Sequence, residues 1–294
     1  MKFPKPAVAV VALVGVTAVW GSTFVVVKDA VERMPVMDFL AWRFAIAALV
    51  MIAVRPRAVA RLDSRGRRRG AVLVLALGAG YVTQTFGLEH TPASVSGFIT
   101  GLFVVFAPLC SALLLRRRIA RVTWLGVALA TSGLALLSLH GVALGRGAGV
   151  TLLCAIAFAL HIVGLGEWSS SHDAAGLAVL QLSTVAVLSI VAAATASLAP
   201  PPDAAAWGAV LLTAIAATAV AFFVQTWAQA HLEPTRAAVV MTMEPVFAGL
   251  FGVTFGGDSL SLRVVIGALL VLAAMYTVEL GPRKSEDATF ERFE

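Results

Sequence analysis

The chain has 294 residues, of which 60% are hydrophobic and only 13% are charged. Its mean hydropathy is +0.92, so a water-soluble fold would have to bury more apolar surface than a globular interior can hold. The net charge of +6 could indicate nucleic-acid binding, but the positions of the basic residues argue against that partner. The composition therefore predicts a membrane protein.

Apolar stretches of about 20 residues follow one another along nearly the whole chain. An α-helix needs about 20 apolar residues to cross the hydrocarbon core of a bilayer. The sequence therefore predicts ten transmembrane helices, which span residues 7–27, 37–54, 70–88, 93–115, 122–139, 147–166, 175–198, 206–230, 236–256 and 260–280.

Basic residues concentrate in alternate connections and at the termini. Of the 22 Lys and Arg residues, 17 fall there, four fall in the other connections, and Arg43 lies within a span. The two largest groups occupy residues 55–69 and 116–121. Because connections rich in Lys and Arg stay on the cytoplasmic side, the pattern predicts that both termini are cytoplasmic. This pattern accounts for the positive charge, so we expect no nucleic-acid partner.

Enzyme and cofactor motifs are missing from the sequence. The only cysteines, Cys110 and Cys154, lie inside predicted spans and indicate neither a disulfide framework nor a metal site. No phosphate-binding loop, zinc-ligand spacing or nucleophile elbow occurs. The longest connection, 55–69, leaves no room for a soluble catalytic domain. We therefore predict no enzymatic activity and no cofactor, and we expect residues 281–294, which are polar, to form a disordered cytoplasmic tail.

The second half of the chain repeats the first at a shift of 141 positions. Gln84 matches Gln225, Thr85 matches Thr226, and His90 matches His231. Each half contains five predicted helices, and an odd number inverts the second copy relative to the first. The fold prediction is an all-α membrane protein with ten transmembrane helices in two inverted five-helix repeats, residues 1–139 and 147–280. Inverted repeats place a binding site near the midplane, which opens to each side in turn.

Three motifs carry a resemblance to a known family. They are Trp20-Gly21-Ser22-Thr23-Phe24 continuing to Lys28, Pro35 followed by Trp42-Arg43-Phe44, and Met243-Glu244-Pro245-Val246-Phe247-Ala248. Together they resemble the EamA-type members of the drug/metabolite transporter superfamily. The resemblance implies a central cavity lined by helices 1, 3, 4, 6, 8 and 9, and export of amino acids or other small metabolites. The Gly-Glu turn typical of each half is Gly257-Asp258 in the second half and is missing from the first.

Three ionisable residues stand out inside the predicted spans, namely Arg43, His161 and Glu244. An ionisable group there costs about 2.5–3.5 kcal/mol unless it meets a partner or a water-filled cavity. Glu244 either bonds nearby polar groups or handles substrate and protons. Arg43 either reaches the headgroups or another helix, or binds a carboxylate through its planar fork. His161 either packs with a hydrogen bond or takes part in proton-linked transport.

Uncharged polar residues repeat on one face of two predicted helices. Tyr81 and Gln84 share a face of helix 3, and Gln225 occupies the matching position on helix 8. They either face the cavity or join helices by hydrogen bonds. The complete set of predicted substrate-binding residues is Trp20, Thr23, Arg43, Tyr81, Gln84, His161, Gln225, Trp227 and Glu244.

These observations predict a secondary transporter in the cytoplasmic (inner) membrane. Its partners would be a small-molecule substrate and the lipid bilayer, and homo-oligomer formation stays open. The alternative from another class is a non-transporting membrane receptor or assembly factor that retains the fold.

Overall fold

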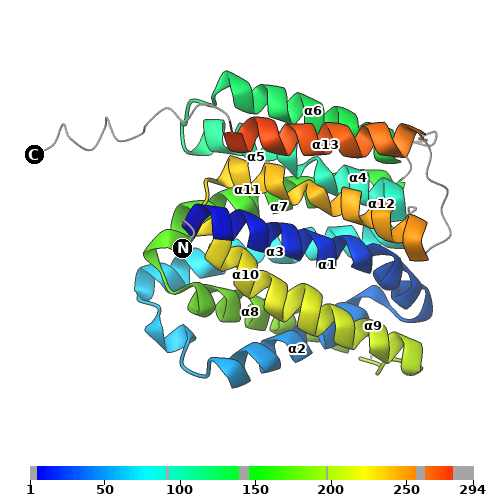
Figure 1. Ribbon diagram of the computed structural model, residues 1–294. Helices are drawn as coiled ribbons and strands as arrows, with labels where there is room; N and C mark the ends of the chain where they lie inside the picture. The colour runs from blue at the N-terminus through cyan, green and yellow to red at the C-terminus, as the bar shows by residue number, and fades with distance from the viewer. Residues whose placement is uncertain (1–4, 91–92, 139–145, 197, 256–261, 281–294) are drawn as a thin grey trace, which may run out of the picture.

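The computed structural model describes residues 5–90, 93–138, 146–196, 198–255 and 262–280, and every regular element in these ranges is helical (Figure 1). The α-helices are α1 (Lys5–Arg33), α2 (Val36–Val54), α3 (Ser64–Glu89), α4 (Ala93–Gly101), α5 (Phe103–Leu114), α6 (Arg121–Ser138), α7 (Arg146–Trp168), α8 (Ala174–Ala194), α9 (Ala204–Ala214), α10 (Ala221–Gln229), α11 (Pro234–Met241), α12 (Met243–Phe255) and α13 (Leu262–Leu280). A π-helix, Ile215–Val220, joins α9 to α10, and short 3-10 turns occupy Val59–Arg61 and Ser169–Ser171. The expected tail, 281–294, lies outside the described residues.

The helices have the length and composition of membrane spans. Six described helical stretches are long and apolar enough to cross a bilayer, and shorter apolar helices cover Ile99–Leu114, Arg121–Leu136 and Val265–Thr277. Large apolar side chains face outward, for example Leu113 at 78% and Val11 at 73% exposure, whereas polar side chains such as Thr17, Gln181 and Gln229 are buried. This distribution suits a surface covered by lipid and an interior where polar groups find partners. The protein is therefore a membrane protein.

Three of the predicted spans are not single regular helices. The span expected at 93–115 breaks at Leu102, and the one expected at 236–256 breaks at Thr242. Pro245 explains the second break, because a proline ring clashes with the carbonyl four residues earlier, at Met241, the last residue of α11. The span expected at 206–230 contains the π-helix.

The predicted start of the third helix was too late. The α-helix begins at Ser64, because the carboxylate of Asp63 caps it by accepting a hydrogen bond from the backbone N–H of Gly66 at 2.7 Å. Several arginines that were expected in the connection, such as Arg67 and Arg69, therefore lie in the first turns of α3.

Packing between the two halves follows a regular scheme. Helix α6 packs along α13 at one edge of the bundle, and α2 packs along α8 at the opposite edge (Figure 1). The interior contacts occur in sets that are equivalent under the 141-residue shift. The contact of α3 with α7 corresponds to that of α10 with α1. The contacts of α4 and α5 with α7 correspond to those of α11 and α12 with α1. The first residues of α1 and the last residues of α13 lie at the same end of the bundle (Figure 1).

Ion pairs join connections at both ends of the bundle. At the end where α1 finishes, Arg33 contacts Asp203 at 3.2 Å, beside the connection between α8 and α9. At the other end, Arg117 contacts Glu167 at 2.8 Å, linking the residues after α5 to the end of α7. Pairs this exposed add little stability, but they show which connections share an end.

Candidate functional site

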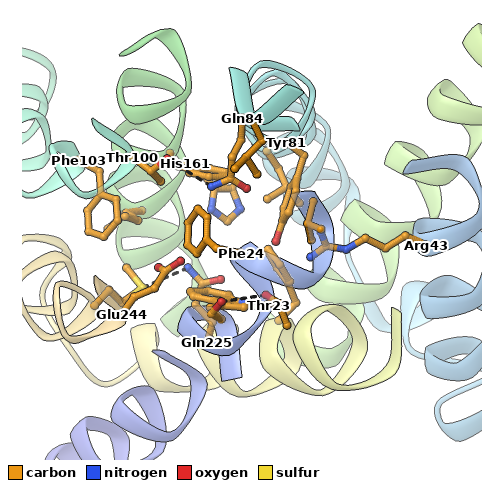
Figure 2. A pocket seen from close by; sticks show the side chains of 18 residues that line it. Thr23, Phe24, Arg43, Tyr81, Gln84, Thr100, Phe103, His161, Gln225 and Glu244 are labelled. Atoms are coloured by element: carbon orange, nitrogen blue, oxygen red, sulfur yellow. Dashed lines mark hydrogen bonds between the residues drawn. The ribbon is translucent and has the colours of Figure 1, made fainter. Parts of the chain in front are cut away.

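The central part of the bundle contains a partly open cavity with a volume of about 60 Å³ (Figure 2). Side chains from both halves of the chain line it. They are Trp20, Thr23, Phe24 and Val27 of α1, Arg43 of α2, Leu77, Tyr81, Gln84 and Leu88 of α3, Thr100 of α4, Phe103 of α5, Phe158, His161 and Ile162 of α7, Phe222 and Gln225 of α10, Met241 of α11 and Glu244 of α12.

Eight of the nine predicted site residues lie in this lining, and the exception is Trp227. Successive residues of a helix are separated by about 100°, so Trp227 points roughly 200° away from Gln225. Its ring packs on His231 at a centroid distance of 5.0 Å. The cavity draws on the six helical segments implied by the family resemblance and, in addition, on Arg43 of α2.

Arg43 is buried, with 4% of its surface exposed, and has no carboxylate within ion-pair distance in the described part of the chain. Its Nε donates a hydrogen bond to Oγ1 of Thr218 at 2.8 Å. Its guanidinium carbon lies 4.7 Å from the centre of the Tyr81 ring, and Figure 2 shows its tip directed toward that residue. Arg43 thus bridges to another helix and also lines the cavity, while its binding of a carboxylate stays a prediction.

The π-helix receives two hydrogen bonds from cavity residues. Besides the bond from Arg43 to Thr218, Nε1 of Trp20 donates to the carbonyl of Ala217 at 2.8 Å. The hydrogen bonds of a π-helix depart from the regular α-helical pattern, and π-helical segments are frequent at functional sites. The hydroxyl of Thr23 donates to the carbonyl of Trp20 at 2.8 Å, which fixes its orientation within α1.

His161 joins α7 to α8. Its Nε2 lies 2.7 Å from Oε1 of Gln181, and the amide nitrogen of Gln181 donates to the carbonyl of Leu177. The amide oxygen can only accept, so Nε2 of His161 carries the hydrogen of this bond. The packing role expected for a histidine in a helix is therefore realised, on a ring that also lines the cavity.

The two repeated glutamines have different partners. The amide nitrogen of Gln84 donates to Oγ1 of Thr100 over a long 3.4 Å. Gln225 is 3% exposed, and its amide nitrogen donates to Oε1 of Gln229 at 3.0 Å. Oε1 of Gln225 is buried and has no hydrogen-bond partner.

Glu244 lies in the first turn of α12, immediately after the break at Thr242. A carboxylate is favoured there by the partial positive charge of a helix N-terminus. It is 9% exposed, and no ion pair or hydrogen bond to its carboxylate is formed within the described ranges. Phe103, which follows the break at Leu102, lies in the same lining.

Aromatic rings form much of the remaining wall. Phe222 lies 5.8 Å from both Trp20 and Tyr81, and Tyr81 lies 5.4 Å from Phe158, between ring centres. The sequence-based prediction did not include Phe222 or Phe103 among the site residues. Applying the 141-residue shift to Tyr81 and Glu244 would have indicated them. Phe158 has no such signal.

The lining is organised in pairs. Ten of the 18 lining residues form five pairs separated by 141 positions. The pairs are Trp20 with His161, Tyr81 with Phe222, Gln84 with Gln225, Thr100 with Met241, and Phe103 with Glu244. Both halves therefore present equivalent positions to one cavity.

Comparison with known proteins agrees with this arrangement. The description "EamA-like transporter family" matches residues 7–139 and again residues 145–280. The chain belongs to the EamA-like transporter family. The two matches together cover nearly the whole chain, and they identify a membrane transporter.

Relatives and a solved structure extend the comparison. An "Uncharacterized transporter" of Archaeoglobus fulgidus is 32% identical over 90% of this chain and 83% of its own length. The "Uncharacterized inner membrane transporter YedA" of Escherichia coli K12 is 25% identical over 92% of this chain and 90% of its own length. A structure titled "Crystal structure of protein" has a TM-score of 0.78 at 19% identity, covering 93% of this chain and 97% of that one, which shows a shared fold.

Proposed function

We propose that this EamA-like transporter exports amino acids or related small metabolites across the cytoplasmic membrane by alternating access. The observation that carries the proposal is the single cavity whose lining contains five pairs of residues at equivalent positions in the two halves. A binding site shared by two repeats can open to either side when one half rocks against the other. No nucleotide site is needed for such a mechanism.

The inverted repeat is supported by two further observations. The family matches the chain twice, once in each half. Contacts between helices also occur in equivalent sets, such as α3 with α7 and α10 with α1. We therefore infer that α4 with α5, α9 with α10, and α11 with α12 each make one crossing, which gives ten crossings in two repeats of opposite orientation.

The proposed orientation relies on the arginine distribution. The ends of α5 and α7, which meet at the Arg117–Glu167 pair, adjoin the connections rich in arginine. By the positive-inside rule this end faces the cytoplasm, and both termini lie there too. The name of the E. coli relative, an inner membrane transporter, supports the location.

Substrate chemistry is inferred from Arg43. A buried arginine without a carboxylate partner, facing a cavity, can bind a carboxylate through two parallel hydrogen bonds. Amino acids and many small metabolites carry that group. The aromatic wall around it would hold an apolar side chain.

The test is a flux assay with the purified full-length protein in proteoliposomes, using a panel of labelled amino acids. We expect saturable uptake or efflux of at least one amino acid and competition by its analogues. A receptor or assembly factor with the same fold would bind a ligand without moving it. Saturable binding with no flux in either direction would contradict the proposal.

A further inference from the structure

A chain of hydrogen bonds fixes the orientation of the Gln225 amide. The backbone carbonyl of Ile162 can only accept, and it receives a bond from the amide nitrogen of Gln229 at 3.0 Å. The amide oxygen of Gln229 therefore faces Gln225, whose amide nitrogen donates to it at 3.0 Å. The same nitrogen lies 3.8 Å from the sulfur of Met241. In this hydrogen-bonded series, which joins Ile162, Gln229 and Gln225, the amide oxygen of Gln225 is buried and has no partner.

This oxygen belongs to a side chain that is 3% exposed and lines the cavity. A buried acceptor without a donor is costly, so native structures rarely keep one unless a ligand or water supplies the missing bond. The amide cannot turn to relieve the cost, because its oxygen would then face the oxygen of Gln229. A residue of the cavity lining therefore carries a fixed, buried acceptor that lacks a hydrogen-bond donor.

Glu244 adds a second acceptor to the same part of the cavity. Figure 2 shows the ends of its side chain and of Gln225 directed toward each other, with Arg43 on the opposite side. Glu244 has no cationic partner in the part of the chain that the structure describes, and neither does Arg43 have an anionic one. The cavity thus has an acceptor side and a donor side.

We infer that the acceptor side, formed by Oε1 of Gln225 and the carboxylate of Glu244, binds the protonated amino group of a zwitterionic substrate. The carboxylate of the same substrate then lies at Arg43. Gln229 does not line the cavity, and it acts as a positioning residue that keeps the oxygen of Gln225 turned inward. The inference rests on the proposed function, because it assigns the orientation of an amino acid in that site.

The test compares three probes that share one apolar part: L-phenylalanine, 3-phenylpropionate, which lacks the amino group, and 2-phenylethylamine, which lacks the carboxylate. Calorimetric titration of the full-length protein gives Kd for each probe. In the wild type we expect L-phenylalanine to bind more tightly than either truncated probe. The ratio of Kd for 3-phenylpropionate to Kd for L-phenylalanine measures the contribution of the amino group.

Gln225→Leu should reduce this ratio by about 10- to 150-fold, because a hydrogen bond to a charged group is lost. Its Kd for 3-phenylpropionate should stay near the wild-type value, which also shows that the variant is folded. Thr226→Val is the control on the same helix: Thr226 is buried, its hydroxyl donates to the carbonyl of Phe222 and it does not line the cavity, so the variant should leave the ratio unchanged.

Gln229→Met tests the positioning role. Without its amide, the Gln225 side chain can turn its nitrogen inward, so the ratio should fall while Gln225 itself is intact. A purely structural Gln229 would lower thermal stability and leave the ratio at the wild-type value, which would overturn its assigned role.

The proposed substrate class and the assignment of the amino group to Gln225 and Glu244 can be contradicted separately. If L-phenylalanine and the rest of the amino-acid panel do not bind the wild type, the proposed substrate class is wrong and the inference fails with it. If L-phenylalanine binds but Gln225→Leu keeps the wild-type ratio, only the assignment of the amino group is wrong.

Discussion

Replacing Arg43 with methionine should strongly weaken carboxylate binding while leaving the fold nearly as stable as before. Methionine retains the length and apolar stem of the side chain and removes the charge, the hydrogen bond to Thr218 and the contact with the Tyr81 ring. The expected outcome depends on which of these contributions to the folded state is largest.

The contributions of the Arg43 side chain to the free energy of unfolding nearly cancel. A hydrogen bond from a charged group contributes about 1.5–3 kcal/mol, and a desolvated guanidinium over an aromatic ring contributes about 2 kcal/mol. Both are lost in the variant. In return, the protein no longer keeps an ion with 4% exposure away from water, a penalty of several kcal/mol. The free energy of unfolding should therefore change by no more than about 2 kcal/mol.

In Arg43→Met, nothing offsets the loss of carboxylate binding. A substrate carboxylate that enters the variant cavity loses water and finds no cation, and truncating one partner of a buried charge pair costs about 2–5 kcal/mol. This corresponds to an increase in Kd of roughly 30- to 4,000-fold. Calorimetric titration gives Kd, and the fraction of monodisperse protein left after heating gives the stability.

Arg263→Met provides a matched control in a second apolar helix. Arg263 donates to the carbonyls of Leu136 at 2.7 Å and Ala135 at 3.4 Å, away from the cavity. This control should lower stability and leave Kd unchanged. The reasoning would be refuted if Arg43→Met bound carboxylate substrates with the wild-type Kd, or if its loss of binding simply followed a loss of folded protein.

Three further predictions concern topology, packing and coupling. Reporter fusions at Arg67 should report the cytoplasm and fusions at Pro201 the opposite side; the same side for both would contradict the proposed topology. Gly133→Ala should cost about 1–3 kcal/mol of stability in a thermal unfolding assay, because an added Cβ would lie 2.6 Å from a backbone carbonyl of α13. Gly149→Ala, with nothing within 4 Å of the added Cβ, should instead be neutral or stabilise by up to about 1 kcal/mol. If Glu244 handles protons, Glu244→Gln should preserve folding and remove the pH dependence of flux, whereas a carboxylate used only as a hydrogen-bond acceptor would leave flux pH-sensitive; unchanged pH dependence in the folded variant would exclude a role in proton coupling.

Much of the helical framework was predictable, because the hydrophobic thickness of a bilayer imposes a length that hydropathy detects directly. The breaks at Leu102 and Thr242 were not. Both lie within continuous apolar runs, where composition does not change as the backbone turns from one helix to the next. Pro245 marks the second break and Gly101, the last residue of α4, marks the first. Such residues are ambiguous signals, because Pro108 lies inside the unbroken helix α5.

Eight of the nine residues predicted for the site lie in the cavity lining. Most of them could be predicted because polar groups are rare in apolar spans and because the repeat shows where to search for their counterparts. What the sequence could not show is how they connect. Thr218, which orients Arg43, lies 175 positions away. Gln229 lies one helical turn after Gln225, and its role depends on the carbonyl of Ile162, 67 positions away. Every residue has a backbone carbonyl, so a pattern of side chains cannot show which carbonyl accepts a hydrogen bond.

The paired residues of the lining occupy equivalent positions in the two halves but differ in their chemistry, and each property suits a different requirement of the proposed transport. The positions of the five pairs are equivalent in the two halves, which suits a mechanism in which the halves exchange conformations. The chemistry at those positions differs in four of the five pairs, for example Phe103 against Glu244. Even the identical pair, Gln84 and Gln225, differs in its hydrogen bonds. A symmetric scaffold thus encloses an asymmetric site, and the proposed zwitterion would keep its direction, with the carboxylate at Arg43, whichever side of the membrane is open.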